Sequence, residues 1–214
     1  TITFTFPAGT NNLSGEYTAG TDTDIPNDIP EYTSNSNGDW SNNTIWTQTG
    51  GTPYPCPVGG PNGFIVIIDS VVTIGLTNKC FSYRTTINNR LEILSPTFGH
   101  NLGNVEGNGT LYLENGILPA GKFDDFFDCT NYGVLEYGGT GNYTIIADRL
   151  DILPSLFFTG TGSRILPNKD LTICRVLKID GPLLDNSVNN RTLIIQGTME
   201  RYNTGTFNCG TGNN

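Results

Sequence analysis

The stretch Gly107-Asn108-Gly109-Thr110-Leu111-Tyr112-Leu113 decides the fold, because small turn-forming residues lead directly into a short run that alternates in polarity. Similar runs lie on both sides of it. Leu91 and Leu135 stand at the equivalent point of those runs, 20 residues before and 24 residues after Leu111. One strand of this length cannot bury its apolar face alone, but strands stacked at this spacing share an interior. The drifting period therefore predicts a solenoid.

Comparable runs fill most of the chain, and each is closed by Gly, Asn or Pro. They are too short for helices and rich in β-branched or aromatic residues, which indicates strands. The twelve runs are Ile2–Phe6, Phe64–Ile68, Val71–Ile74, Leu91–Leu94, Thr110–Leu113, Val134–Tyr137, Tyr143–Ile146, Leu150–Leu153, Leu156–Phe158, Leu171–Ile173, Val176–Ile179 and Thr192–Ile195. The predicted fold class is all-β, a right-handed parallel β-helix. A two-sheet β-sandwich, which short strands also permit, is the alternative.

Alternation within the runs predicts which side chains point into the tube. Neighbouring strands lie about 4.8 Å apart, so six to eight coils would form a rod roughly 30–40 Å long. The predicted inward residues are Leu91, Ile93, Leu111, Leu113, Leu135, Leu177, Ile179, Leu193 and Ile195. Leu177 and Leu193 are expected at equivalent points of successive coils.

One segment, Gly121–Cys129, hints at helical structure. Phe123, Phe126 and Phe127 have the spacing that places side chains on one face of a helix. We expect a single turn that seals a corner of a coil, rather than an aromatic ligand site.

Composition limits the classes of partner. The chain has 214 residues, of which 14% are charged, and its net charge is −9. Phosphate binding needs clustered Lys and Arg, but the 11 basic residues are scattered singly, so nucleic acid is not an expected partner. The longest apolar stretch, Phe64–Ile68, is far too short to cross a bilayer as a helix, so no membrane insertion is expected in this segment.

The five cysteines, Cys56, Cys80, Cys129, Cys174 and Cys209, contain no C-x-x-C pair, which argues against zinc and thioredoxin-type chemistry. An odd count cannot pair completely within one chain. A Cys56–Cys80 bridge is one possibility, because these two residues flank one hairpin-like segment. Buried free thiols are the other.

The chain divides into two regions. Residues 1–31 are expected to form an N-terminal strand followed by an irregular cap or loop, and residues 32–214 the β-helix-like domain. Because the sequence starts inside a strand pattern and ends in Gly and Asn, we expect a fragment of a much longer polypeptide.

Two groups of residues are candidate binding sites. Trp40 and Trp46 are candidates for stacking on sugar rings, with core packing as the alternative. Asp22, Asp24 and Asp28 could supply hard oxygen ligands to Ca²⁺, although the EF-hand spacing is missing and a solvated acidic loop would look the same. Ca²⁺ is the only cofactor that the sequence suggests.

The sequence gives only weak evidence for a catalytic site. His100, the only histidine, has no nucleophile motif around it and is expected in a solvated loop. Carboxylates suited to glycoside chemistry also occur, but nothing in their spacing shows that they converge. The candidate acids are Asp124, Asp125, Glu136, Asp148 and Asp151, and the basic residues considered with them are Arg149, Arg164, Arg175 and Lys178.

An ordered set of motifs over roughly residues 32–197 resembles the β-helix-bearing surface adhesins of the Bacteroidota, exported by the type IX secretion system and including the SprB-type gliding adhesins. The motifs are Tyr32-Thr33-Ser34, Gly38-Asp39-Trp40-Ser41, Trp46, Val66-Ile67-Ile68-Asp69, Val72-Thr73-Ile74, Gly107–Leu113, Gly116, Pro119-Ala120-Gly121, Leu135-Glu136-Tyr137-Gly138-Gly139 and Asn142-Tyr143-Thr144. The resemblance implies an extracellular module that attaches to surfaces or polysaccharide and takes part in gliding. It supplies no catalytic motif.

The sequence thus favours a non-enzymatic adhesive module at the cell surface, with neighbouring domains of the same chain and extracellular surfaces or polysaccharide as its partners. A carbohydrate-binding module is the alternative. A β-helix polysaccharide lyase or hydrolase is a third possibility.

Overall fold

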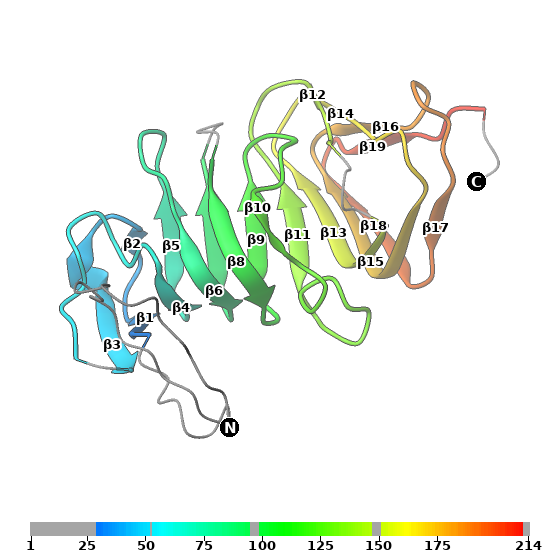
Figure 1. Ribbon diagram of the computed structural model, residues 1–214. Helices are drawn as coiled ribbons and strands as arrows, with labels where there is room; N and C mark the ends of the chain where they lie inside the picture. Colours follow the sequence, from blue (N-terminus) through cyan, green and yellow to red (C-terminus); the bar gives the residue numbers. More distant parts are fainter. Residues whose placement is uncertain (1–28, 52, 95–98, 147–150, 212–214) are drawn as a thin grey trace, which may run out of the picture.

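The computed structural model describes residues 29–51, 53–94, 99–146 and 151–211, and it shows an all-β chain wound into a parallel β-solenoid of about seven turns (Figure 1). This confirms the solenoid and rejects the sandwich. No described segment forms a helix that is long and apolar enough to span a membrane.

One wall of the solenoid is a continuous nine-stranded sheet, here called the long wall. All its neighbouring strands are parallel, in the order β17-β15-β13-β11-β9-β7-β5-β2, with β18 also paired to β15. Its strands are β2 (Gly38–Asp39), β5 (Val71–Ile74), β7 (Arg90–Ile93), β9 (Thr110–Leu113), β11 (Val134–Tyr137), β13 (Ile152–Thr159), β15 (Leu171–Asp180), β17 (Leu193–Ile195) and β18 (Thr198–Tyr202).

The remaining strands form two further sheets, here together called the split wall. The first sheet has the order β10-β8-β6-β4-β1-β3, and the second has the order β12-β14-β16-β19. Their strands are β1 (Glu31–Ser34), β3 (Trp46–Gly50), β4 (Phe64–Ile68), β6 (Ser82–Ile87), β8 (Asn101–Glu106), β10 (Ala120–Lys122), β12 (Tyr143–Thr144), β14 (Ser163–Ile165), β16 (Leu183–Asp185) and β19 (Thr206–Asn208). Only the β1–β3 pair is antiparallel, and β3 covers the outer edge of β1 at one end of the rod.

Leu91, Leu111 and Leu135 are direct partners on β7, β9 and β11, which confirms the predicted column. The column continues through Leu156 and Leu177, and all five side chains are buried. The other predicted inward residues are buried too, except that Ile195 is only partly so.

The expected equivalence of Leu177 and Leu193 is wrong. Leu177 pairs with Met199, whereas Leu193 pairs with Leu171. The error arises because β15 is a single long strand that carries two of the predicted runs.

The predicted turn in Gly121–Cys129 is confirmed. The Phe127 N–H donates to the Phe123 carbonyl oxygen over 2.8 Å, which closes one turn, and residues 124–127 form no helix. Phe123, Phe126 and Phe127 are all buried. The turn lies between β10 and β11, where the first sheet of the split wall ends, so the three rings cover the core at this seam.

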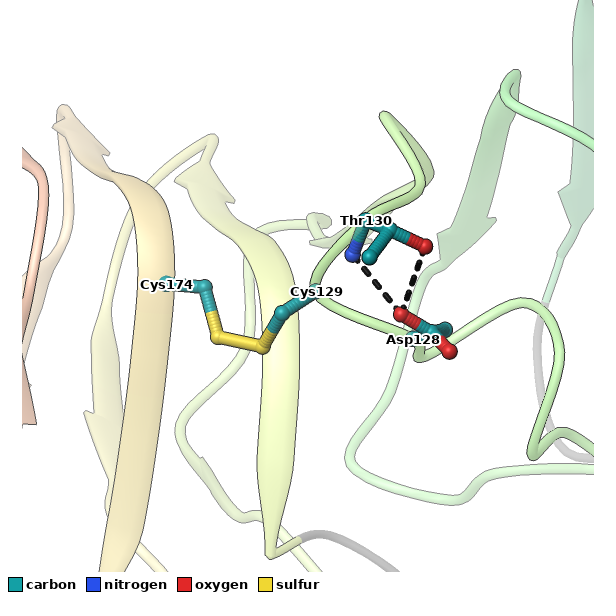
Figure 2. The surroundings of a disulfide bond; sticks show 4 residues. All are labelled: Asp128, Cys129, Thr130 and Cys174. Carbon is teal, nitrogen blue, oxygen red and sulfur yellow. Dashed lines mark hydrogen bonds between the residues drawn. A yellow bond between two sulfur atoms is a disulfide. The ribbon is translucent and has the colours of Figure 1, made fainter.

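A disulfide joins Cys129, which follows this turn, to Cys174 on β15, with Cα atoms 5.7 Å apart (Figure 2). The Cys56–Cys80 bridge considered above is therefore wrong, because neither thiol is in a disulfide. The predicted flanking relationship fails because Cys80 is fully buried in the core, whereas Cys56 only packs against its edge.

A corner of the tube is built from residues in the left-handed backbone region. Gly139, Gly160 and Gly181 have φ values of 82°, 82° and 107° and follow one another from rung to rung. A side chain at Gly160 or Gly181 would collide with the carbonyl oxygen of the glycine before it. Asn203, which tolerates this region, has φ 51° and takes the next place.

Candidate functional site

Trp40 and Trp46 lie in the core at the β3 end of the rod. Trp40 is 0% exposed and Trp46 is 6% exposed, their rings meet edge to face at 5.3 Å, and the Trp46 indole N–H donates to the Trp40 carbonyl oxygen over 3.0 Å. This burial favours core packing over sugar stacking, because neither ring presents a face to solvent.

Several other sequence candidates fall outside the described residues. They are Asp22, Asp24 and Asp28 of the suggested Ca²⁺ loop, and Asp148 and Arg149 of the suggested catalytic group. Among the residues that the structure does describe, no group of three or more His, Cys, Asp or Glu side chains is placed to hold a metal ion.

His100 does not lie in a solvated loop as expected. Its side chain is buried, and its Nδ1 atom lies 3.4 Å from the Cys80 sulfur. Burial lowers the pKa of His100, with the nearby Lys79 charge adding to the effect, while burial raises the pKa of Cys80 to about 12. The pair is a neutral element of the core. The burial of His100 was not predicted because a single histidine shows no repeating pattern from which its burial could be inferred.

Asp124 and Asp151 line a hollow of about 480 Å³ beside the disulfide, together with Phe127, Asp128, Cys129 and Ile152. Both carboxylates are strongly exposed and are paired with lysines, Asp124 with Lys122 and Asp151 with Lys169. Asp128 accepts hydrogen bonds from the backbone N–H and the hydroxyl of Thr130, which lower its pKa (Figure 2).

The basic candidates are scattered. The Arg175 guanidinium lies 3.5 Å above the Tyr132 ring, beside the disulfide, and Lys178 lies on the long wall. Arg164 points into the interior and is 0% exposed. It donates to the carbonyl oxygens of Gly138, Gly139, Gly141 and Thr159, and burial lowers its pKa. Asp124 and Asp151 therefore share one hollow, whereas Arg164 lies in the interior and Lys178 on the long wall.

Of the sequence candidates, Glu136 and Lys178 come together with other residues in one structural feature, the outer face of the long wall. One outward residue from each rung falls in a single column: Glu92, Tyr112, Glu136, Phe157, Lys178 and Glu200. With their neighbours Arg90, Asp180 and Tyr202 these residues are called the ladder face. Charged side chains and aromatic rings alternate along most of its length.

Arg90 organises the first half of the ladder face. Its Nε donates to Glu92 over 2.7 Å and its Nη1 to Glu136 over 2.6 Å, so that it spans the rung between them. Burial lowers the pKa of Arg90, but the hydrogen bonds to Glu136 and Glu92 outweigh this and raise it overall. The second oxygen of each carboxylate accepts a threonine hydroxyl, Thr73 for Glu92 and Thr159 for Glu136.

Tyr112 lies within this network. The Arg90 guanidinium carbon is 4.6 Å from the centre of its ring, and its hydroxyl oxygen accepts the Gly139 N–H over 3.1 Å. The ring packs over Gly138, because a Cβ at that position would collide with it. Burial raises the pKa of Tyr112, so the phenol stays neutral. Half-buried and held at both ends, Tyr112 is a preorganised ring.

Lys178 organises the second half. Its ammonium nitrogen lies 3.3 Å from Asp180, 5.8 Å from the centre of the Phe157 ring and 5.0 Å from that of the Tyr202 ring. The Tyr202 hydroxyl donates to Glu200 over 3.3 Å, and Tyr202 is 49% exposed. Rings and charges here support one another across three rungs.

Comparison of the chain with protein-family models, with curated proteins and with solved structures gives no match in any of the three. The ladder face holds aromatic rings, hydroxyls and carboxylates in fixed positions on adjacent rungs, so it can form ring contacts and hydrogen bonds along the surface.

Proposed function

We propose that this protein is a passive attachment module that acts outside the cell and holds polysaccharide against its ladder face. The observation that carries the proposal is the register of the long wall, which repeats aromatic and charged side chains in one column over six rungs. A polymer can meet the same kinds of contact repeatedly along such a column. Several weak contacts on one rigid surface then add up to useful avidity.

An extracellular location is supported by the Cys129–Cys174 bridge, because disulfides persist in oxidising compartments. The low charged content and the resemblance to Bacteroidota surface adhesins point the same way. On this proposal the module contributes to attachment at the cell surface, and to gliding if the resemblance extends to function.

A non-enzymatic role is supported by the partners that described acid and base candidates already have. Arg164 donates hydrogen bonds to four carbonyl oxygens inside the tube. Asp151 forms an ion pair with Lys169 at the seam. Glu136 is bonded to Arg90 and Thr159 on the ladder face.

The test is binding of a polysaccharide panel, measured by affinity electrophoresis, for Tyr112→Ala, Phe157→Ala and Tyr202→Ala. Controls are Tyr83→Ala and Tyr132→Ala, whose rings are 60% and 61% exposed but lie away from the ladder face. Each lost ring contact should cost about 1 kcal/mol, or roughly fivefold in affinity. Equal loss in the controls, or no loss in the three ladder variants, would overturn the proposal.

A further inference from the structure

The charges and spacing of the ladder face narrow the class of ligand, an inference that rests on the function proposed above. We propose that the ligand is an uncharged, extended polysaccharide that runs along the solenoid axis, across the strands, and contacts an aromatic ring on every second rung.

The spacing of the rings gives the direction of the chain. Tyr112 on β9 and Phe157 on β13 are separated by one rung, which carries Glu136. Tyr202 on β18 is separated from Phe157 by the rung of Lys178 and lies two residues along its strand from the column. Two rungs span about 9.6 Å. In a flat β-1,4-linked chain, alternate sugars present the same face, so the repeating unit is a disaccharide of about this length. Rings on alternate rungs suit that repeat.

The charges disfavour a polyanion. The ladder face carries two cations, Arg90 and Lys178, against four carboxylates, Glu92, Glu136, Asp180 and Glu200, which leaves a net charge of −2. Both cations already contact carboxylates of the face. A uronic-acid chain would therefore meet repulsion and find no cation free to bind it.

The same contacts disfavour a polycation. Every oxygen of Glu92 and Glu136 already accepts a hydrogen bond from Arg90 or from a threonine, and Glu136 is 8% exposed. An incoming ammonium group would have to displace Arg90 to gain a close contact with Glu92 or Glu136.

A neutral polyol needs no such displacement. Its hydroxyl groups donate to the carboxylate lone pairs that remain, and its C–H faces lie on the rings of Phe157 and Tyr202. Because a neutral polymer forms no ion pair with the protein, binding should be nearly independent of salt.

The experiment compares neutral β-1,4-linked polymers (hydroxyethyl cellulose and glucomannan), polyanions (polygalacturonate and alginate) and the polycation chitosan, at low and high salt. We expect the neutral polymers to bind with less than a twofold change between salts, and Tyr112→Ala and Phe157→Ala to weaken them. Stronger binding of a charged polymer that fades with salt and is weakened by the same variants would overturn the ligand class but keep the proposed function. No binding of any polymer would overturn both.

The dependence of affinity on oligosaccharide length tests whether the bound chain runs along the solenoid axis. Affinity should rise about fivefold when the oligosaccharide becomes long enough to reach from Tyr112 to Phe157, and Phe157→Ala should remove that step while Tyr83→Ala keeps it. A smooth length dependence in the wild-type protein, or a step that persists in Phe157→Ala, would overturn the axial arrangement.

Discussion

The long wall and the split wall enclose the same core but are built differently. On the long wall, β5, β7, β9 and β11 pair with no register shift, so each column of side chains continues from rung to rung. On the split wall, the pairing shifts between β4 and β6 and again between β8 and β10, and the sheet then ends. Regular pairing between β5, β7, β9 and β11 aligns their surface side chains, whereas the disulfide reaches β15, where the pairing of the long wall shifts as well.

Three cross-links lie at or near the seam of the split wall. The turn with Phe123, Phe126 and Phe127 covers the core, and the disulfide joins that turn to β15. Arg164 donates hydrogen bonds to the backbone of Gly138 and Gly139, at the corner between β11 and β12. If this comparison is right, changes at the seam should reduce stability more than changes on the long wall.

The largest effect should follow from removing the disulfide. The bridge closes a loop of 45 residues, so Cys129→Ser with Cys174→Ser should lower the free energy of unfolding by about 4 kcal/mol. Urea denaturation under non-reducing conditions measures this, with Cys209→Ser as the control at an exposed cysteine. A double variant that unfolds at the same urea concentration as the wild type would show that the disulfide does not stabilise the seam.

Arg164→Met should have the next largest effect. The change removes the guanidinium from four backbone carbonyl oxygens, of which Gly138 keeps the Tyr143 hydroxyl and Gly139 keeps the Thr161 N–H, so it should cost about 3 kcal/mol. Arg201→Met, at an exposed position, is the matched control. If the two variants unfold alike, water replaces the guanidinium at little cost and Arg164 is not a cross-link.

On the long wall, Gly138→Ala should have a moderate effect of about 2 kcal/mol, because the new methyl group collides with the Tyr112 ring. The φ of Gly138 lies outside the left-handed region, so the backbone itself accepts alanine. Adding Tyr112→Ala to Gly138→Ala should therefore recover part of the loss. Strictly additive effects in this double-mutant cycle would contradict the packing of Tyr112 over Gly138.

The smallest effect concerns pH and His100. The pKa of His100 is lower in the folded chain than its ordinary value of 6.5, so unfolding takes up a proton in the range between the two values. Its contribution to stability is complete above pH 6.5 and is lost as the pH falls through the folded pKa. Melting temperatures of wild type and His100→Gln from pH 8 to pH 5 should converge on acidification. Parallel curves would show that His100 does not titrate on unfolding.

The sequence predicted the regular part of this molecule best. The runs Phe64–Ile68, Val71–Ile74, Thr110–Leu113 and Val134–Tyr137 are strands with the predicted bounds, because turn-forming residues bound each of them. Ile2–Phe6 lies outside the described residues, so its prediction stays open.

The strands β6 and β8 were missed because each carries one extra residue. Two consecutive residues are not buried in each strand, Tyr83 and Arg84 in β6 and Gly103 and Asn104 in β8, and this breaks the period of two. The β13 and β15 strands were each predicted as two runs for the related reason that their pairing shifts midway.

Only part of the ladder face could be predicted from the sequence. The outward alternates of the predicted strands include Tyr112, Glu136 and Lys178, so their common face followed from the column of leucines. The contacts of Arg90 with residues two rungs away, and the pairing of Cys129 with Cys174, depend on how far each coil turns, and spacing along the chain does not give that.

The glycine corner has a consequence for the reach of the molecule. From Gly139 to Gly160 and from Gly160 to Gly181 is 21 residues each time, and each such unit advances the rod by one strand separation, about 4.8 Å. Duplicating one unit would insert a whole rung with its corner already formed. The length of the rod can therefore change in equal steps of one rung, at positions set by the corner glycines.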